Sequence, residues 1–260
     1  MPGPVAADLG RRLLISGATC LALAGRGARA QPTRRRYMVV SLLAERLHFV
    51  TARDFVGSNI DRNRRDELAD QNRAFDYYAL AALAAGIEAE DPGAHVDLIS
   101  LPESPLHDKP DQLISGDSVV LPGHLVDALD KARSSHLLLI TKYRAEARMP
   151  VVSGSIGTGW LSGVGYYIDH STPLRMADSG KTGTGFIAPY VHARLTLADA
   201  TTGQVLRQQT LVRAEVIAVA ADEKLGNAWG VLSPAEKIDR LRHFLRSELS
   251  AAARQLVAAR

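Results

Sequence analysis

The spacing of apolar residues predicts a mixed fold in which strands and helices alternate along the chain. Compact apolar runs predict strands over residues 37–43, 95–101 and 136–141. The third run is apolar on both faces, which is typical of a central strand covered on both sides. Residues 47–52 are expected to run back beside the first strand, and the polar composition of residues 57–70 indicates irregular structure.

Apolar positions at helical spacing predict three helices between and after these strands. Residues 72–90 repeat apolar side chains at this spacing, and a second helix is expected to begin at Pro122. The third helix has the clearest start, because Ser233 is an N-cap residue, Pro234 suits the first turn and Glu236 completes a capping box. Its apolar face continues to the C-terminus.

A glycine-rich segment, residues 151–189, differs in kind from its surroundings. It holds eight glycines, and within it only residues 163–169 have the pattern of a strand. Residues 190–200 and 205–219 then flank a Thr-Thr-Gly-Gln turn, which predicts an antiparallel hairpin. The expected fold class is α/β (α+β): one domain with a mixed sheet, helices packed on it, a C-terminal helix and an insertion at 151–189.

The first thirty residues have the pattern of a secretory signal peptide. Arg11 and Arg12 precede a short apolar run at 13–24, and an A-x-A cleavage site occupies 28–30. The run is shorter than the roughly 20 residues that a membrane span needs. We therefore expect a mature domain, residues 31–260, that is periplasmic or secreted and has no transmembrane helix. The arginine pair also resembles a twin-arginine export signal, so that route and the Sec route both stay open.

Removal of this leader changes the charge and the thiol content of the chain. Residues 1–30 carry four arginines and one aspartate, a formal +3, which equals the net charge of the whole sequence. The mature domain is then formally neutral, which argues against a nucleic-acid partner. Cys20 is the one cysteine of the sequence, so the mature domain would have no disulfide and no thiol nucleophile. Gly17 and Thr19 do not fit a lipidation motif around Cys20, which argues against an acyl anchor.

Several short motifs resemble ligand-binding loops but lack the required spacing. The SGKT segment at 179–182 has neither the upstream glycine nor the following helix of a phosphate-binding loop. The GSIGTG segment at 154–159 departs from the spacing of a dinucleotide-binding loop. The eight histidines are scattered without metal-ligand spacing. We therefore predict no cofactor and no metal.

Two serines are the candidates for a nucleophile. Ser155 lies in SGSIG, which nearly matches a nucleophile elbow, and Ser118 ends a GDS segment similar to that of one esterase family. However, Ser153 replaces the first elbow glycine, and Asp239 and His243 are spaced one residue too wide for that esterase family. No catalytic residue is predicted. A secreted hydrolase with a site assembled from distant residues stays an alternative, as does a periplasmic small-ligand-binding protein.

The hairpin at residues 193–206 (ARLTLADATTGQVL) carries a resemblance to known proteins. A strand, a D-x-x-T-G turn and a second strand make it similar to hairpins of the curli secretion lipoprotein, penicillin-binding-protein activator lipoproteins and TolB N-terminal-like domains. The whole chain also resembles uncharacterised secreted proteins of proteobacteria. The first resemblance implies a mixed α/β fold and a function in binding partners.

The resemblance leads to a hypothesis of a non-catalytic periplasmic protein that binds an envelope protein or a cell-wall component. Under this hypothesis the glycine-rich segment is the interaction segment. Its aromatic residues are the expected partner-binding residues, because aromatic side chains often anchor interfaces. They are Trp160, Tyr166, Tyr167 and Phe186.

Overall fold

The computed structural model describes residues 34–53, 61–70, 72–101, 105–152, 154–175, 182–219 and 227–258. The predicted signal peptide at 1–30 and Cys20 lie outside the described residues. Residues 34–260 form one compact unit.

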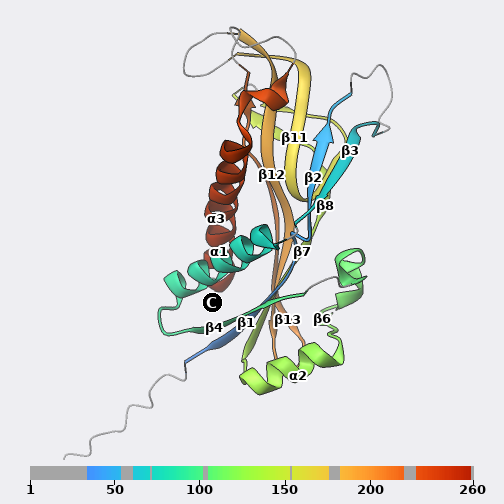
Figure 1. The fold of residues 1–260 in the computed structure, drawn as a ribbon. Helices are drawn as coiled ribbons and strands as arrows, with labels where there is room; N and C mark the ends of the chain where they lie inside the picture. The colour runs from blue at the N-terminus through green and yellow to red at the C-terminus, as the bar shows by residue number, and fades with distance from the viewer. Residues whose placement is uncertain are drawn as a thin grey trace, which may run out of the picture. The chain divides into compact units, whose positions relative to one another are not determined.

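The described residues form three α-helices and fourteen strands (Figure 1). The helices are α1 (Ala74–Glu90), α2 (Gly123–Ala132) and α3 (Pro234–Ala258). The strands are β1 (Arg36–Leu42), β2 (Arg46–Thr51), β3 (Arg64–Ala69), β4 (His95–Ser100), β5 (Ile114–Ser115), β6 (Ser118–Val119), β7 (His136–Lys142), β8 (Arg144–Glu146), β9 (Met149–Val151), β10 (Gly154–Ile156), β11 (Trp160–Arg175), β12 (Thr182–Asp199), β13 (Val205–Ala214) and β14 (Ile217–Ala218). Short 3-10 helices cover Pro105–His107, Pro110–Leu113 and Ala228–Val231.

Ten of these strands form one mixed sheet with β12 at its centre. The order β3-β2-β11-β12-β7-β1-β4 includes parallel pairs of β1 with β4 and β7, and of β2 with β11. Along one edge, β12 pairs first with β11 and then with β7. Along its other edge it pairs with β14 and then β13. The predicted mixed sheet and C-terminal helix are confirmed.

Side-chain alternation along the strands separates the core into layers. In β1, Tyr37 and Val39 pack with residues of α1 and α3, whereas Met38 and Val40 pack with residues of α2. Helices therefore cover both faces of the sheet, as the apolar run in β7 predicted. The capping box at the start of α3 is also confirmed, because the Ser233 N–H donates to Glu236 Oε2 at 2.8 Å.

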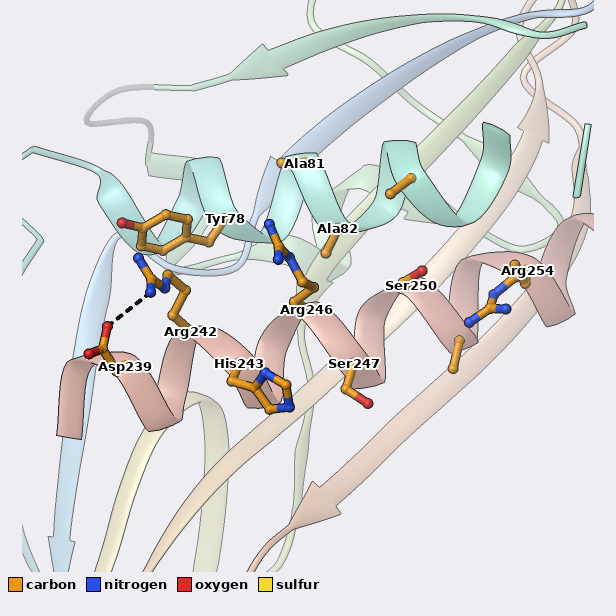
Figure 2. Close-up of a pocket in the computed structure, with 12 residues that line it drawn as sticks. Tyr78, Ala81, Ala82, Asp239, Arg242, His243, Arg246, Ser247, Ser250 and Arg254 are labelled. Atoms are coloured by element: carbon orange, nitrogen blue, oxygen red, sulfur yellow. Dashed lines mark ion pairs between the residues drawn. The ribbon is translucent and has the colours of Figure 1, made fainter. Parts of the chain in front are cut away.

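Helices α1 and α3 lie side by side on one face of the sheet (Figure 2). Their contact depends on Gly86, where an added Cβ would lie 2.4 Å from the carbonyl oxygen of Ser250 and 2.8 Å from Ala253 Cβ. Both distances are too short for a real side chain, so only glycine permits this approach.

The glycine-rich segment forms longer strands than the one predicted at residues 163–169. Residues 151–189 contribute to the two longest strands, β11 and β12, which form the middle of the sheet. Glycine is needed in this sheet because an added Cβ at Gly165 would lie 1.8 Å from the carbonyl oxygen of His48 on β2. Glycine at this position permits the close approach of two strands.

Two further predictions about the first strands were wrong. β2 does not run back beside β1, because it pairs with β3 and β11 in the other half of the sheet. Part of the polar stretch 57–70 is not irregular but forms β3, whose six residues are all exposed. A two-sided polar edge strand has no apolar alternation that could reveal it.

A buried carboxylate joins α1 to the carboxyl ends of two parallel strands. Ser41 on β1 and Ser100 on β4 are register partners, and each hydroxyl donates to the carboxylate of Asp76. Arg73 Nη2 donates to the same carboxylate at 3.2 Å. Asp76 is 1% exposed, so these donors replace the water that a carboxylate would otherwise bind.

We predict that Asp76→Ala destabilises the chain by about 3 kcal/mol, because it leaves the buried Ser41 hydroxyl, the partly buried Ser100 hydroxyl and a guanidinium without their acceptor. Urea unfolding measures the change. Asp127→Ala, at an exposed position of α2, is the control and should cost less than about 0.5 kcal/mol. Equal losses in the two variants would show that the buried carboxylate does not hold α1 in place.

Candidate functional site

The structure separates Trp160 from the other three predicted partner-binding residues. Trp160 is 38% exposed, whereas Tyr166 is 2% exposed and Tyr167 and Phe186 are fully buried. Tyr167 stacks on Phe186 with ring centroids 5.8 Å apart, and the Tyr166 hydroxyl donates to the carbonyl oxygen of Lys237 at 2.6 Å. These three residues are therefore core residues, and their assignment to a contact surface was wrong. Trp160 stays a candidate.

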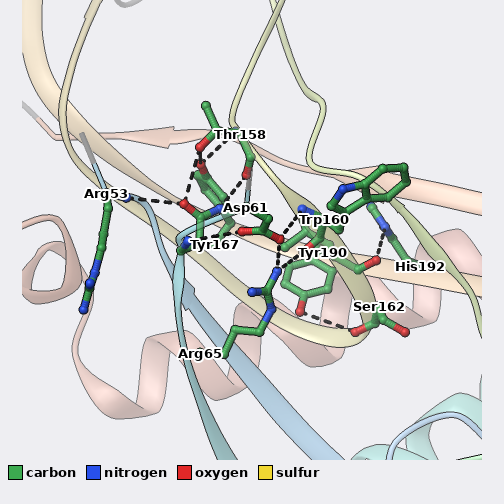
Figure 3. Close-up of polar contacts among 11 residues, drawn as sticks. Arg53, Asp61, Arg65, Thr158, Trp160, Ser162, Tyr167, Tyr190 and His192 are labelled. Carbon is green, nitrogen blue, oxygen red and sulfur yellow. Dashed lines mark hydrogen bonds and ion pairs between the residues drawn. The ribbon is translucent and has the colours of Figure 1, made fainter. Parts of the chain in front are cut away.

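Both backbone polar groups of Trp160 are held by side chains that precede or lie in β3 (Figure 3). The Trp160 N–H donates to Asp61 Oδ2 at 3.0 Å, and Arg65 Nη2 donates to the Trp160 carbonyl oxygen at 2.9 Å. Arg65 also forms an ion pair with Asp61, so one closed network holds the peptide groups on both sides of the indole. Trp160 pairs with Glu146 of β8 as well. The exposed indole therefore stands on a fixed backbone.

The turn before Trp160 is fitted closely to the same network. Asn63 Nδ2 donates to the Thr158 carbonyl oxygen at 2.6 Å, and the Thr158 N–H donates to the Tyr167 hydroxyl at 3.0 Å. Gly159 has a φ of 80°, and an added Cβ there would lie 2.5 Å from Asp61 Oδ1. A larger residue would meet both backbone strain and the carboxylate, so this glycine is required by the network.

Electrostatics favour the ionised network. Burial would raise the pKa of the Asp61 carboxyl, but hydrogen bonds from Arg65 and from the N–H groups of Asn63 and Trp160 lower it below its ordinary value.

Arg144 on β8 places its guanidinium 5.2 Å from the centre of the Trp160 ring. The contact is a cation–π pair, so the exposed patch presents an aromatic face beside a positive charge.

A buried histidine supports the strand that carries Trp160. His192 on β12 is 1% exposed, and its Nδ1 lies 3.3 Å from the Leu161 carbonyl oxygen. Burial lowers the pKa of His192 to about 4, although the backbone contact acts in the opposite direction. The ring is therefore neutral at pH 7 and donates its Nδ1–H to β11. We assign it a structural role.

The serines proposed as nucleophiles are not joined to a catalytic partner. Within the described residues, no recorded hydrogen bond links Ser118 or Ser155 to a histidine or a carboxylate. Ser135 Oγ does lie 2.8 Å from Nδ1 of the adjacent His136. Asp199 is the strand-register partner of His136, but its carboxylate accepts hydrogen bonds from the N–H groups of Thr201 and Thr202.

Ser135 also has a clear structural role. Its hydroxyl accepts from the Arg36 N–H and lies within donating distance of the Arg36 carbonyl oxygen, both at 3.1 Å. It therefore connects the start of β1 to the start of β7.

The described part of the chain contains no cluster of three or more histidine, cysteine, aspartate or glutamate residues that could hold a metal. None of the helices described is both long enough and apolar enough to cross a bilayer.

Comparisons with known proteins give only distant structural likenesses. No protein-family model matches the sequence, and no curated protein matches it. A neuraminyllactose-binding hemagglutinin homolog from Helicobacter pylori aligns with a TM-score of 0.43 at 5% identity, covering 86% of this chain and 85% of that chain. A PelC dodecamer from Paraburkholderia phytofirmans aligns with a TM-score of 0.35 at 12% identity, covering 86% and 89%. A Xanthomonas campestris protein of the family DUF330 aligns with a TM-score of 0.36 at 10% identity, covering 87% and 86%.

Likenesses of this size assign neither a family nor a function. Nothing in the comparisons shows the predicted resemblance to the curli secretion lipoprotein, the penicillin-binding-protein activators or TolB. That resemblance stays a prediction.

The network around Asp61 predicts an acid transition at Trp160. A carboxyl with a lowered folded pKa stabilises its contacts above the unfolded pKa and loses them as the pH falls through the folded value. In a Trp229→Phe background, where Trp160 is the one remaining tryptophan, its fluorescence should stay constant from pH 7 to about 4 and change below that.

Asp61→Asn should remove this transition and give the acid spectrum already at pH 7. Asp66→Asn, which changes a carboxylate of β3 that pairs with Arg64 at 2.9 Å, is the matched control and should leave the transition in place. An Asp61→Asn chain that titrates like its parent would refute the role of the carboxylate.

Proposed function

We propose that the chain is a non-catalytic binding protein of the cell envelope and that Trp160 is its contact residue. The observation that carries the proposal is the exposed indole on a backbone that Asp61 and Arg65 hold from both sides. An aromatic side chain that is already fixed loses little conformational entropy when it is covered by a partner. Tryptophan is also among the residues most often found at the energetic centre of interfaces.

The chemistry around Trp160 supports binding over catalysis. The carboxylate of Asp61 and the amide of Asn63 are used in hydrogen bonds to the backbone of the turn. Both groups therefore have a structural role in holding this turn. Arg144 adds a positive charge over the indole ring, which favours a partner with both an apolar and an anionic group.

Location and partner class are part of the same proposal. The basic start, the short apolar run and the A-x-A site of residues 1–30 support export by a cleavable signal peptide, through the Sec or the twin-arginine route. The exported chain would begin at Gln31 and contain no cysteine. An envelope protein or a cell-wall component is the partner class that such a location offers. The hairpin similar to those of envelope-assembly proteins supports a protein partner.

Site-specific photocrosslinking in cells tests the role of Trp160. A benzoylphenylalanine at position 160 of the full-length chain should give a discrete adduct, because the partner covers this side chain. The same photoprobe at Trp229, which is 36% exposed, and at Tyr77, which is 56% exposed, should give none. Excess purified wild-type chain should compete for the adduct at least about tenfold better than the Trp160→Ala chain.

The Trp229 and Tyr77 probes make the experiment decisive because Trp229 is nearly as exposed as Trp160 and Tyr77 is more exposed. Peptides of a second protein in the mass spectrum of the digested adduct identify a protein partner, and sensitivity of the adduct to a cell-wall hydrolase identifies a glycan. Similar adducts at all three positions, no adduct at 160, or equal competition by the Trp160→Ala chain would each contradict the proposal.

A further inference from the structure

A groove with a volume of about 740 Å³ runs between α1 and α3 and shares no lining residue with the Trp160 network (Figure 2). Its volume lies in the range of ordinary ligand sites. Small side chains of α1, including Ala81 and Ala85, form one side of the groove. Side chains of α3 form the other, and most of the long ones are arginines.

The groove exists because small residues bring the two helices together. Gly86 allows α1 to touch the backbone of α3 at Ser250, and Ala82 is buried beside this contact. Side chains as short as those of Ala81 and Ala85 then leave the space next to the contact open. The side of the groove formed by α1 is therefore lined mainly by small apolar side chains, and another chain can pack against it.

The arginines of α3 give the groove a net positive charge. Arg242, Arg246 and Arg254 line it together with a single carboxylate, that of Asp239. They are four and eight residues apart, which at the rise of an α-helix places them about 6 Å and about 12 Å apart along the axis. Arg242, Arg246, Ser250 and Arg254 thus follow one another at every fourth residue of α3.

The charge of this row is only partly neutralised inside the chain. Arg242 pairs with Asp239 at 3.0 Å and lies 5.7 Å from the centre of the Tyr78 ring. Arg246 and Arg254 are exposed, and within the described residues no ion pair or hydrogen bond is recorded for either side chain. The facing stretch of α1 contributes alanines and Tyr78 to the lining and no carboxylate. The groove therefore has cationic groups to offer to an anionic partner.

We infer that this groove binds an acidic helical segment of a partner protein. Arginine presents a planar fork that matches a carboxylate, and three such forks in a row suit a ligand with repeated carboxylates. A helix has the same rise as α3, so glutamates at every fourth position can face the arginine row. Its alanine-sized or apolar side chains can then rest on the floor formed by α1. This is the helix-in-groove mode of recognition, and it does not depend on Trp160.

A designed peptide tests the inference directly. The probe is a fluorescein-labelled, alanine-based helical peptide with glutamates at positions i, i+4 and i+12, acetylated and amidated at its ends. Fluorescence anisotropy with the purified full chain at roughly 50 mM salt, where screening is weak, should show saturable binding. A peptide of the same length with glutamines in place of the glutamates should bind at least about tenfold more weakly.

Variants of α3 place the binding in the groove. Arg246→Glu with Arg254→Glu should weaken binding at least about tenfold, and Arg246→Ala with Arg254→Ala should weaken it in the same direction. Arg240→Glu is the matched control, because Arg240 lies on the same helix but pairs with Glu215 outside the groove. It should change the affinity less than about twofold. Exposed arginines without recorded partners can be replaced without unfolding α3, and circular dichroism checks this.

The same anisotropy assay tests two alternative ligands of the groove, a free phosphate and a lipid surface. Inorganic phosphate and phosphatidylglycerol vesicles should fail to displace the peptide at concentrations comparable with its own. Binding of those probes with the same dependence on Arg246 and Arg254, without binding of the peptide, would overturn the inference of a protein segment. Peptide binding that ignores the arginines or the glutamates, or no binding, would also overturn it. A Trp160→Ala chain should bind the peptide normally, so this site and the proposed function fail separately.

Discussion

Hydrogen bonding along both edges of β12 is the constraint on which the rest of the structure depends. This strand pairs with β11 and β7 on one side and with β14 and β13 on the other. Its side chains divide the core, because Ile187 and Val191 pack toward α1 and α3 while Phe186 and Tyr190 face the opposite layer. A strand that is paired on both edges over most of its length fixes its neighbours in register.

Both candidate surfaces are held in place by this centre. Trp160 begins β11, the direct partner of β12, and side chains at 61 and 65 hold its peptide groups. The groove depends on α3, which is fixed to β11 where the Tyr166 hydroxyl donates to the Lys237 carbonyl oxygen. Tyr166, Tyr167 and Phe186 are thus part of the core on which α3 and Trp160 are positioned.

The sequence predicted those helices and strands in which the spacing of apolar residues fits only one type of secondary structure. β1, β7, α1 and α3 were found in this way, and the capping box located the start of α3 within a residue. The centre of the sheet was missed because Gly165 reports on the approach of His48 from β2, a neighbour more than 100 residues earlier in the chain. The residues around Gly165 do not predict a contact with a residue so far away in the sequence.

The candidate surfaces were predictable only in part for the same reason. Exposure of Trp160 was expected. Tyr166, Tyr167 and Phe186 are buried because β11 and β12 pair, and the glycine-rich sequence did not predict this pairing. The network that holds Trp160 joins residues 61–65 to residues 158–160, and no pattern relates these two stretches. The arginine row of α3 was visible in the sequence, but the alanine floor that turns it into a groove belongs to α1.

Amide hydrogen exchange of the purified chain tests most directly whether β11 and β12 are the centre of the fold. The account predicts that the amides of Tyr166, Tyr167, Ile187 and Val191 exchange only through global unfolding, with the slowest rates in the chain. Exchange of these amides as fast as that of exposed loop residues would contradict a central position of β11 and β12 in the fold.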